Sequence, residues 1–168
     1  MKKLLLFAIV ILGFSAASFG QIQTILEDNN ASATIIETLS IASTGGEDLN
    51  FGTIGSPKNA SVVSITPAGV RGGTADLVNI DEGSTPTFTI TGQDDAVVTV
   101  TLPGTIQLIL TGSDPMNVDT WTSTISALNN VILDGGSYEF QIGATLHVNA
   151  EQDAGEYTGE YDIIVAYN

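Results

Sequence analysis

The side chains that could carry out chemistry are few in this sequence, and most of them are carboxylates. Nineteen Asp and Glu residues accompany a single histidine, His147, and no cysteine. A hydrolytic triad needs a serine held next to a histidine, and the sequence lacks the Gly-x-Ser-x-Gly turn that presents such a serine. Zinc sites usually draw on several His or Cys ligands, and no glycine-rich phosphate-binding motif is present. We therefore expect no enzymatic activity and no cofactor, and we interpret His147 as a solvated residue on the polar face of a strand.

Acidic pairs lie in four predicted turns: Glu47 with Asp48, Asp81 with Glu82, Asp94 with Asp95, and Glu151 with Asp153. Calcium takes about six to eight oxygen ligands, and acidic loops can supply them. None of the pairs has the regular spacing of a calcium-binding loop, so we interpret each as a solvated turn and leave calcium binding as an alternative. Two carboxylates at a suitable separation could also hydrolyse a glycosidic bond, but separations cannot be read from the sequence.

The charge balance excludes several classes of partner. Four Lys and Arg residues stand against nineteen acids, which gives a formal net charge of −15. Two of the four, Lys2 and Lys3, lie at the N-terminus. Binding to nucleic acid relies on Lys and Arg that neutralise phosphates, and attraction to anionic lipid relies on the same residues. We therefore expect no nucleic-acid partner and no attraction to an anionic membrane surface.

The N-terminal residues predict export. Lys2 and Lys3 precede an apolar run at residues 4–12, and small residues follow before Gln21. This is the pattern of a cleavable signal peptide, here residues 1–20. A membrane-spanning helix would need about 20 apolar residues, and no other run in the chain is long enough. We expect a protein of the cell surface or the extracellular space, with the periplasm as an alternative.

After Gln21 the sequence predicts strands and turns. Fifty residues are Thr, Ile or Val, which favour the pleated surface of a sheet. The clearest strands are residues 138–148 and 157–167, where apolar and polar residues alternate as in a strand with one buried face. Shorter strands are predicted at residues 34–42, 49–54, 62–66, 87–91, 96–102 and 106–111, with turns rich in Gly, Pro, Asn and Asp between them. Residues 71–84 are poorly patterned and predict a long loop.

Together these elements predict a single all-β domain, an antiparallel β-sandwich over residues 34–168. The aromatic residues of the two clearest strands fall on the apolar side of the alternation, so we expect them in the core. Trp121 is the only tryptophan. A half-buried place in the core is its more common fate, and stacking on a ligand is the alternative.

Several blocks of the sequence also carry a resemblance to a known family. They are Asp-Leu-Asn-Phe-Gly-Thr-Ile at 48–54, Phe-Thr-Ile-Thr-Gly at 88–92, Phe-Gln-Ile-Gly-Ala-Thr-Leu-His-Val at 140–148 and Ala-Gly-Glu-Tyr-Thr-Gly at 154–159. These blocks resemble the exported bacterial proteins catalogued as domain of unknown function 4402. Ala144 stands where that family often has a second glycine. The resemblance implies export and a β-rich fold, and it implies no established activity.

The end of the chain, residues 155–167, is more distantly similar to the terminal strand of spore-coat-protein-U-type pilins of archaic chaperone–usher systems. This likeness implies an immunoglobulin-like or pilin-like sandwich that lacks one strand, which the N-terminal extension of a neighbour supplies. Added strands are held by main-chain hydrogen bonds and by alternate side chains in pockets. Residues 21–33 would be that extension, with Ile22, Thr24 and Leu26 on the inserted face. A disordered leader or an ordinary first strand is the alternative.

From these observations we expect a non-enzymatic, exported structural or adhesion protein of the cell surface. Its partners would be further copies of itself or other surface subunits, joined by strand addition. The alternative is a monomeric extracellular module that binds a glycan or a protein through loops at residues 71–84 and 113–121. Arg71 and Trp121 are the candidate contact residues of those loops.

Overall fold

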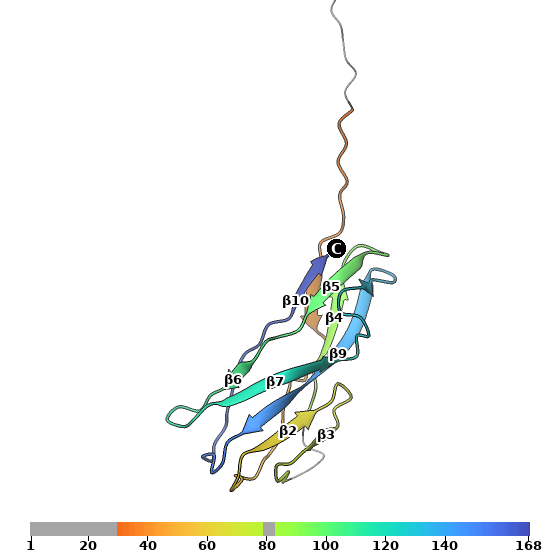
Figure 1. Ribbon diagram of the computed structural model, residues 1–168. Helices are drawn as coiled ribbons and strands as arrows, with labels where there is room; N and C mark the ends of the chain where they lie inside the picture. The colour runs from red at the N-terminus through yellow and green to blue at the C-terminus, as the bar shows by residue number, and fades with distance from the viewer. Residues whose placement is uncertain (1–29, 79–82) are drawn as a thin grey trace, which may run out of the picture. The chain divides into compact units, whose positions relative to one another are not determined.

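The computed structural model describes residues 30–78 and 83–168 (Figure 1). One compact unit, Ile35–Asn168, contains every strand that is described. The predicted signal peptide and the donor positions Ile22, Thr24 and Leu26 lie outside the described residues, so they stay predictions. In the part of the chain that is described, no helix is long and apolar enough to cross a membrane.

The described strands all pair antiparallel and form two sheets, which confirms the predicted all-β sandwich. The larger sheet contains β1 (Ser40–Ser43), β2 (Ser61–Ile65), β3 (Arg71–Gly73), β4 (Thr87–Thr91), β6 (Ile106–Leu108), β7 (Met116–Ser123) and β9 (Ser137–Val148). The smaller sheet contains β5 (Val97–Thr101), β8 (Val131–Ile132) and β10 (Ile164–Tyr167). β1 is an edge strand of the larger sheet and β10 is an edge strand of the smaller one.

The larger sheet is built around β9. Residues 137–141 of β9 pair with β4, and residues 144–148 pair with β2. β7 pairs with β9 between residues 142 and 147. Because an antiparallel strand has two edges, β7 occupies one edge of β9 while β4 and β2 follow each other along the other edge.

Alternate side chains of β9 enter two clusters of buried residues. The β5 cluster consists of Ile90, Val98, Val100, Ile125, Val131, Leu133, Phe140 and Ile142. The β2 cluster consists of Phe51, Val63, Ile65, Met116, Val118, Ala144, Leu146 and Val148. Burial of each large apolar side chain contributes about 1.5–3 kcal/mol. The three-stranded sheet covers the β5 cluster, whereas the partly buried side chains packed on the β2 cluster come mainly from residues 49–54, β6, Trp121 and Tyr157.

β7 corrects the sequence prediction, which placed residues 113–121 in a loop. Met116 and Val118 are buried and Asn117 is exposed, which is the alternation of a strand. Thr120 then adopts a φ of 51°, and the register with β9 shifts between Asp119 and Thr122. This β-bulge interrupts the alternation of buried and exposed residues, so neither part of β7 is long enough to be predicted as a strand from the sequence.

The ends of the domain also differ from the sequence prediction. β1 covers only Ser40–Ser43, and β10 begins at Ile164. Residues 49–54 and Thr158 contribute isolated bridges instead of strands, and β3 lies in the predicted loop at 71–84. The predicted strands at β2, β4, β5, β6 and β9 are confirmed within a few residues of their bounds.

Gly143 is where the end of β2 lies against β9. A Cβ at this position would overlap the carbonyl oxygen of Ile65 and lie 2.8 Å from the nitrogen of Pro67. We expect Gly143→Ala to lower the free energy of unfolding by roughly 1–3 kcal/mol, because main-chain atoms yield less readily than flexible side chains. Gly104→Ala is the control, since a Cβ there has nothing within 4 Å. Urea unfolding measures both, and equal midpoints for the two variants would contradict the packing described.

Candidate functional site

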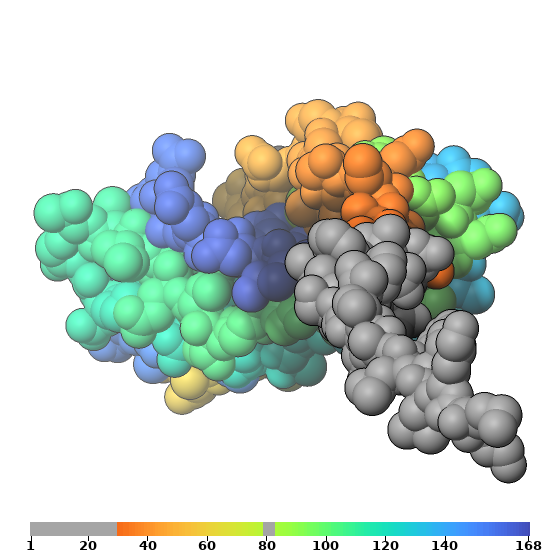
Figure 2. All heavy atoms as spheres, turned by 90° about the horizontal axis from the view of Figure 1, so that it is seen from above, coloured from red at the N-terminus to blue at the C-terminus, as the bar shows by residue number. Residues whose placement is uncertain are grey.

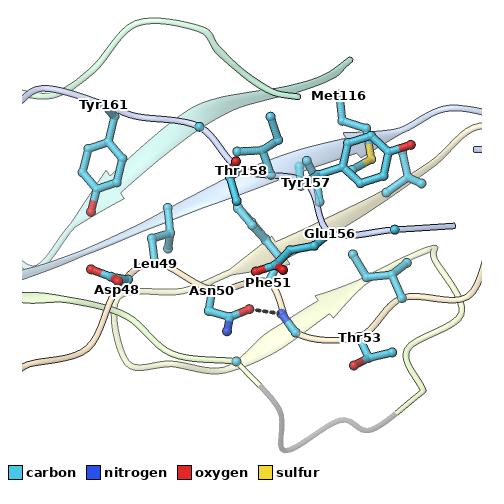
Figure 3. Close-up of a pocket in the computed structure, with 18 of the residues that line it drawn as sticks. Asp48, Leu49, Asn50, Phe51, Thr53, Met116, Glu156, Tyr157, Thr158 and Tyr161 are labelled. Carbon is cyan, nitrogen blue, oxygen red and sulfur yellow. Dashed lines mark hydrogen bonds between the residues drawn. The ribbon is translucent and has the colours of Figure 1, made fainter. Parts of the chain in front are cut away.

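A groove of about 1240 Å³ lies over the β2 cluster between two extended segments (Figure 3). We name residues 48–56 the first wall and residues 152–162 the second wall. Asp48 and Tyr161 lie at one end of the close-up, and Thr53 and Tyr157 lie at the other, so the two walls run in opposite directions (Figure 3). Seen from above, the blue C-terminal segment lies along the surface next to the green residues around β6 (Figure 2).

The floor of the groove is apolar. It includes Phe51, Met116, Leu146 and Val148, all members of the β2 cluster. In the part of the chain that the structure describes, no strand covers the cluster between the two walls. These four side chains are only 1–6% exposed, so the apolar surface that the groove still exposes belongs to partly buried lining residues such as Leu49, Ile54, Leu108 and Tyr157.

The first wall is held from the side away from the groove. Asn50 exchanges main-chain hydrogen bonds of 3.0 and 3.1 Å with Ser84. Arg71 is buried behind the wall, only 5% exposed, and its Nη2 donates to the carbonyl oxygen of Thr53 at 3.2 Å. Within the wall, the Asn50 side chain accepts a hydrogen bond from the Gly52 N–H at 2.7 Å (Figure 3). These contacts fix the wall from behind.

The second wall is likewise held from its far side, by the residue that follows β6. Thr158 and Ile109 exchange two main-chain hydrogen bonds of 2.8 and 3.2 Å. Main-chain groups of successive residues in an extended strand point to opposite sides, so those of Tyr157 and Gly159 point toward the groove. Neither residue makes a main-chain hydrogen bond to another described residue. This edge is therefore available to a further strand.

Gly159 allows the second wall to lie this close to β6. A Cβ at this position would overlap the carbonyl oxygen of Gln107 and come within 2.9 Å of Cδ2 of Leu108. The glycine that ends the Ala-Gly-Glu-Tyr-Thr-Gly block is thus a requirement of packing, because any side chain there would push the wall off β6.

The two walls meet at one end of the groove. Ser56 Oγ donates to the carbonyl oxygen of Gln152 at 2.7 Å, and the Glu151 N–H donates to the carbonyl oxygen of Pro57 at 2.7 Å. The buried Gln152 side chain donates from Nε2 to the hydroxyl oxygen of Tyr157 at 2.8 Å. This network joins the walls where they would otherwise separate.

Tyr161 and Trp121 form an aromatic pair at the other end of the groove. Their ring centroids are 5.0 Å apart, and the Trp121 Nε1 donates to the carbonyl oxygen of Gly104 at 2.8 Å. Trp121 packs against both clusters of the core. Burial, and to a smaller extent the charge of Asp48, raises the pKa of Tyr161 from 10 to about 12.

The two predicted contact residues of the alternative binding module have structural roles here. Arg71 lies behind the first wall and Trp121 lies under Tyr161, and each makes a hydrogen bond inside the fold. Neither stands in a long exposed loop, since Arg71 begins β3 and Trp121 belongs to β7. Whether either contacts a ligand stays a prediction.

His147 lies on the exposed face of β9, as expected from the alternation. Its Nε2 is 2.9 Å from Oδ1 of Asp119 on β7, and the two side chains are 47% and 35% exposed. Hydrogen bonds from His147 and Thr120 lower the pKa of Asp119. Exposed pairs of this kind contribute at most about 1 kcal/mol to the stability of the fold. The contact between His147 and Asp119 therefore adds little to the pairing of β7 with β9.

Among the acidic pairs, Asp48 and Asp153 line the groove, and Asp81 and Glu82 lie outside the described residues. Within the residues that are described, no group of three or more His, Asp or Glu side chains could hold a metal ion. Calcium binding therefore stays an untested alternative.

The groove itself was not anticipated, although two of its parts stood out in the sequence. The blocks at 48–54 and 154–159 lie in opposite walls. Residues 39–167 match the family described as Domain of unknown function (DUF4402). The chain belongs to this family. The match spans every described strand of the domain, which confirms the resemblance to DUF4402, and neither the curated proteins nor the solved structures contain a significant match.

In this DUF4402 domain, the raised pKa of Tyr161 allows a test of whether this side chain is buried at the end of the groove. A pKa raised from 10 to about 12 in the folded state means that the neutral phenol stabilises the fold below pH 10. That contribution is lost as the pH rises through about 12, because the unfolded chain releases the proton more easily. We expect the free energy of unfolding to fall between pH 10 and 12, and to fall less in Tyr161→Phe. Urea unfolding across this range measures the slope, and equal slopes for both proteins would contradict the burial of Tyr161.

Proposed function

We propose that this protein is a non-enzymatic, exported structural or adhesion subunit of the cell surface that associates by accepting a β-strand into the groove. The proposal is supported by the groove between two walls that are each paired on their far sides, with no described strand between them. An added strand would cover the partly buried apolar side chains of the groove, such as Leu49 and Leu108, and would meet the main-chain groups of Tyr157 and Gly159. Main-chain pairing combined with side-chain pockets is the general mode of strand addition.

Residues 21–33 of another copy are the proposed strand. At about 3.3 Å per residue this segment is long enough to run along the second wall. Ile22, Thr24 and Leu26 alternate onto one face, which suits a floor made of apolar side chains. Another surface subunit with a similar segment is the other partner that this proposal admits.

Export and display at the surface are proposed from the N-terminal residues. The basic, apolar and small regions of residues 1–20 have the order of a signal peptide. The absence of a catalytic sequence motif favours a structural or adhesive role over an enzymatic one. Fold alone does not decide function, so the groove is the feature to test.

The proposal predicts the mass distribution of two forms of the chain. The chain that begins at Gln21 should give a series of multimers in size exclusion with light scattering, and the chain that begins at Thr34 should be a monomer. Removal of residues 21–33 takes away the donor strand and leaves the acceptor domain intact. A sharp monomer for both forms would contradict strand addition and would turn attention to a monomeric binding module.

Matched substitutions in the donor segment separate strand insertion from unspecific association. Leu26→Asp should weaken association at least about tenfold, because it would place a carboxylate against the apolar floor. Gln23→Asp adds the same charge on the opposite face and should change association by less than about threefold. Equal effects of the two substitutions would contradict the proposed face of insertion.

A further inference from the structure

We infer that the acidic rims of the groove make strand addition depend on ionic strength, so that copies associate at high salt and separate at low salt. The inference rests on the proposed function, since it concerns the same groove and the same entering segment. Ionic strength would then decide whether a strand occupies the groove.

The rims of the groove carry negative charge on both walls. Its lining includes five exposed carboxylates, Asp48 on the first wall and Asp153, Glu156, Glu160 and Asp162 on the second. None of the described residues that line it is Lys, Arg or His. The side chain of Glu156 projects into the space between the walls (Figure 3).

Apart from its terminal α-amino group, the entering segment of a second copy brings no compensating positive charge to this groove. Residues 21–33 contain Glu27 and Asp28 and no Lys or Arg. Beyond Lys3 the chain has only Lys58 and Arg71 as basic residues, and Arg71 is buried behind the first wall. Like charges placed across an interface oppose association and slow the encounter. Charged residues beside an open strand edge also protect it from indiscriminate pairing.

Salt screens the repulsion between the rim carboxylates and the acidic residues of the entering segment, and it does not weaken the contact between apolar side chains. The distance over which charges interact is about 10 Å at 0.1 M salt and about 3 Å at 1 M. The rim carboxylates are exposed, so mobile ions reach them. Burial of the partly exposed apolar side chains of the groove does not depend on such screening, and it still favours association when the rims are screened.

The test measures association of the chain that begins at Gln21 by light scattering at about 20 mM and about 500 mM NaCl. We expect the apparent association constant to rise at least about tenfold between the two. The double variant Glu156→Gln/Glu160→Gln removes two of the five rim carboxylates, and its association constant should rise clearly less between the two salt concentrations. The control Glu139→Gln/Asp134→Asn removes two exposed acids that do not line the groove, and it should keep the full salt dependence. Circular dichroism checks that each variant is folded.

Each outcome of this experiment decides the inference. If the control loses its salt dependence as fully as the rim variant, the net charge of the chain is responsible and the inference about the rims is wrong. If CaCl₂ promotes association more than NaCl at equal ionic strength, specific cation binding replaces screening and the inference is again wrong. Association that does not respond to salt overturns the inference and leaves strand addition standing. The absence of multimers at every salt concentration, in every variant, would instead overturn the proposed function and this inference with it.

Discussion

Alternate side chains of β9 enter both clusters of the core, and the two halves of the sandwich depend on this one pattern of burial. A slip of one residue in its pairing would turn Phe140, Ile142, Leu146 and Val148 outward and bring their polar neighbours inward. Burial of these four side chains contributes on the order of 6–12 kcal/mol, which is comparable with the whole net stability of a typical domain at about 5–15 kcal/mol. The register of β9 is therefore strongly determined, and β2, β4 and β7 pair along its two edges.

The same strand connects the fold to the proposed function. Its first half lies under the three-stranded sheet, while its second half supplies Leu146 and Val148 to the floor of the groove. In both walls the main-chain hydrogen bonds described above, those of Asn50 and Thr158, lie on the side away from the groove. The space between the walls is therefore of the kind that another strand can fill. Gly159 and the contact between Ser56 and Gln152 hold the walls in this arrangement. If the groove accepts a strand as proposed, the acidic rims would protect its open edge from indiscriminate pairing.

Alternation in the sequence predicts β2, β4, β5, β6 and β9, but the equally regular residues 157–167 form a strand only from Ile164. β9 is the clearest example, because its inward residues alternate from Tyr138 to Val148. β7 could not be predicted, since the bulge at Thr120 divides its alternation into two short pieces. The inward parity of Tyr157 and Tyr161 was predicted correctly, but a continuous strand was not formed there because only Thr158 finds a partner among the described residues.

The groove could not be predicted from either wall by itself. Residues 48–54 and 154–159 are far apart in the sequence, and both read as ordinary strand and turn. The two segments face each other only because β9, β2 and β6 set the positions of the two walls. The blocks that carry the family resemblance did mark both places, although they gave no indication that the two would face each other.

Amide exchange at the second wall would detect directly whether a strand enters the groove. A synthetic peptide of residues 21–33 would be added to the chain that begins at Thr34, and exchange would be followed residue by residue by NMR. We predict that the amides of Tyr157 and Gly159, which point toward the groove, become strongly protected, whereas the Thr158 amide, already bonded to Ile109, changes little. Unchanged exchange at Tyr157 and Gly159 in the presence of saturating peptide would contradict the claim that the groove accepts this strand.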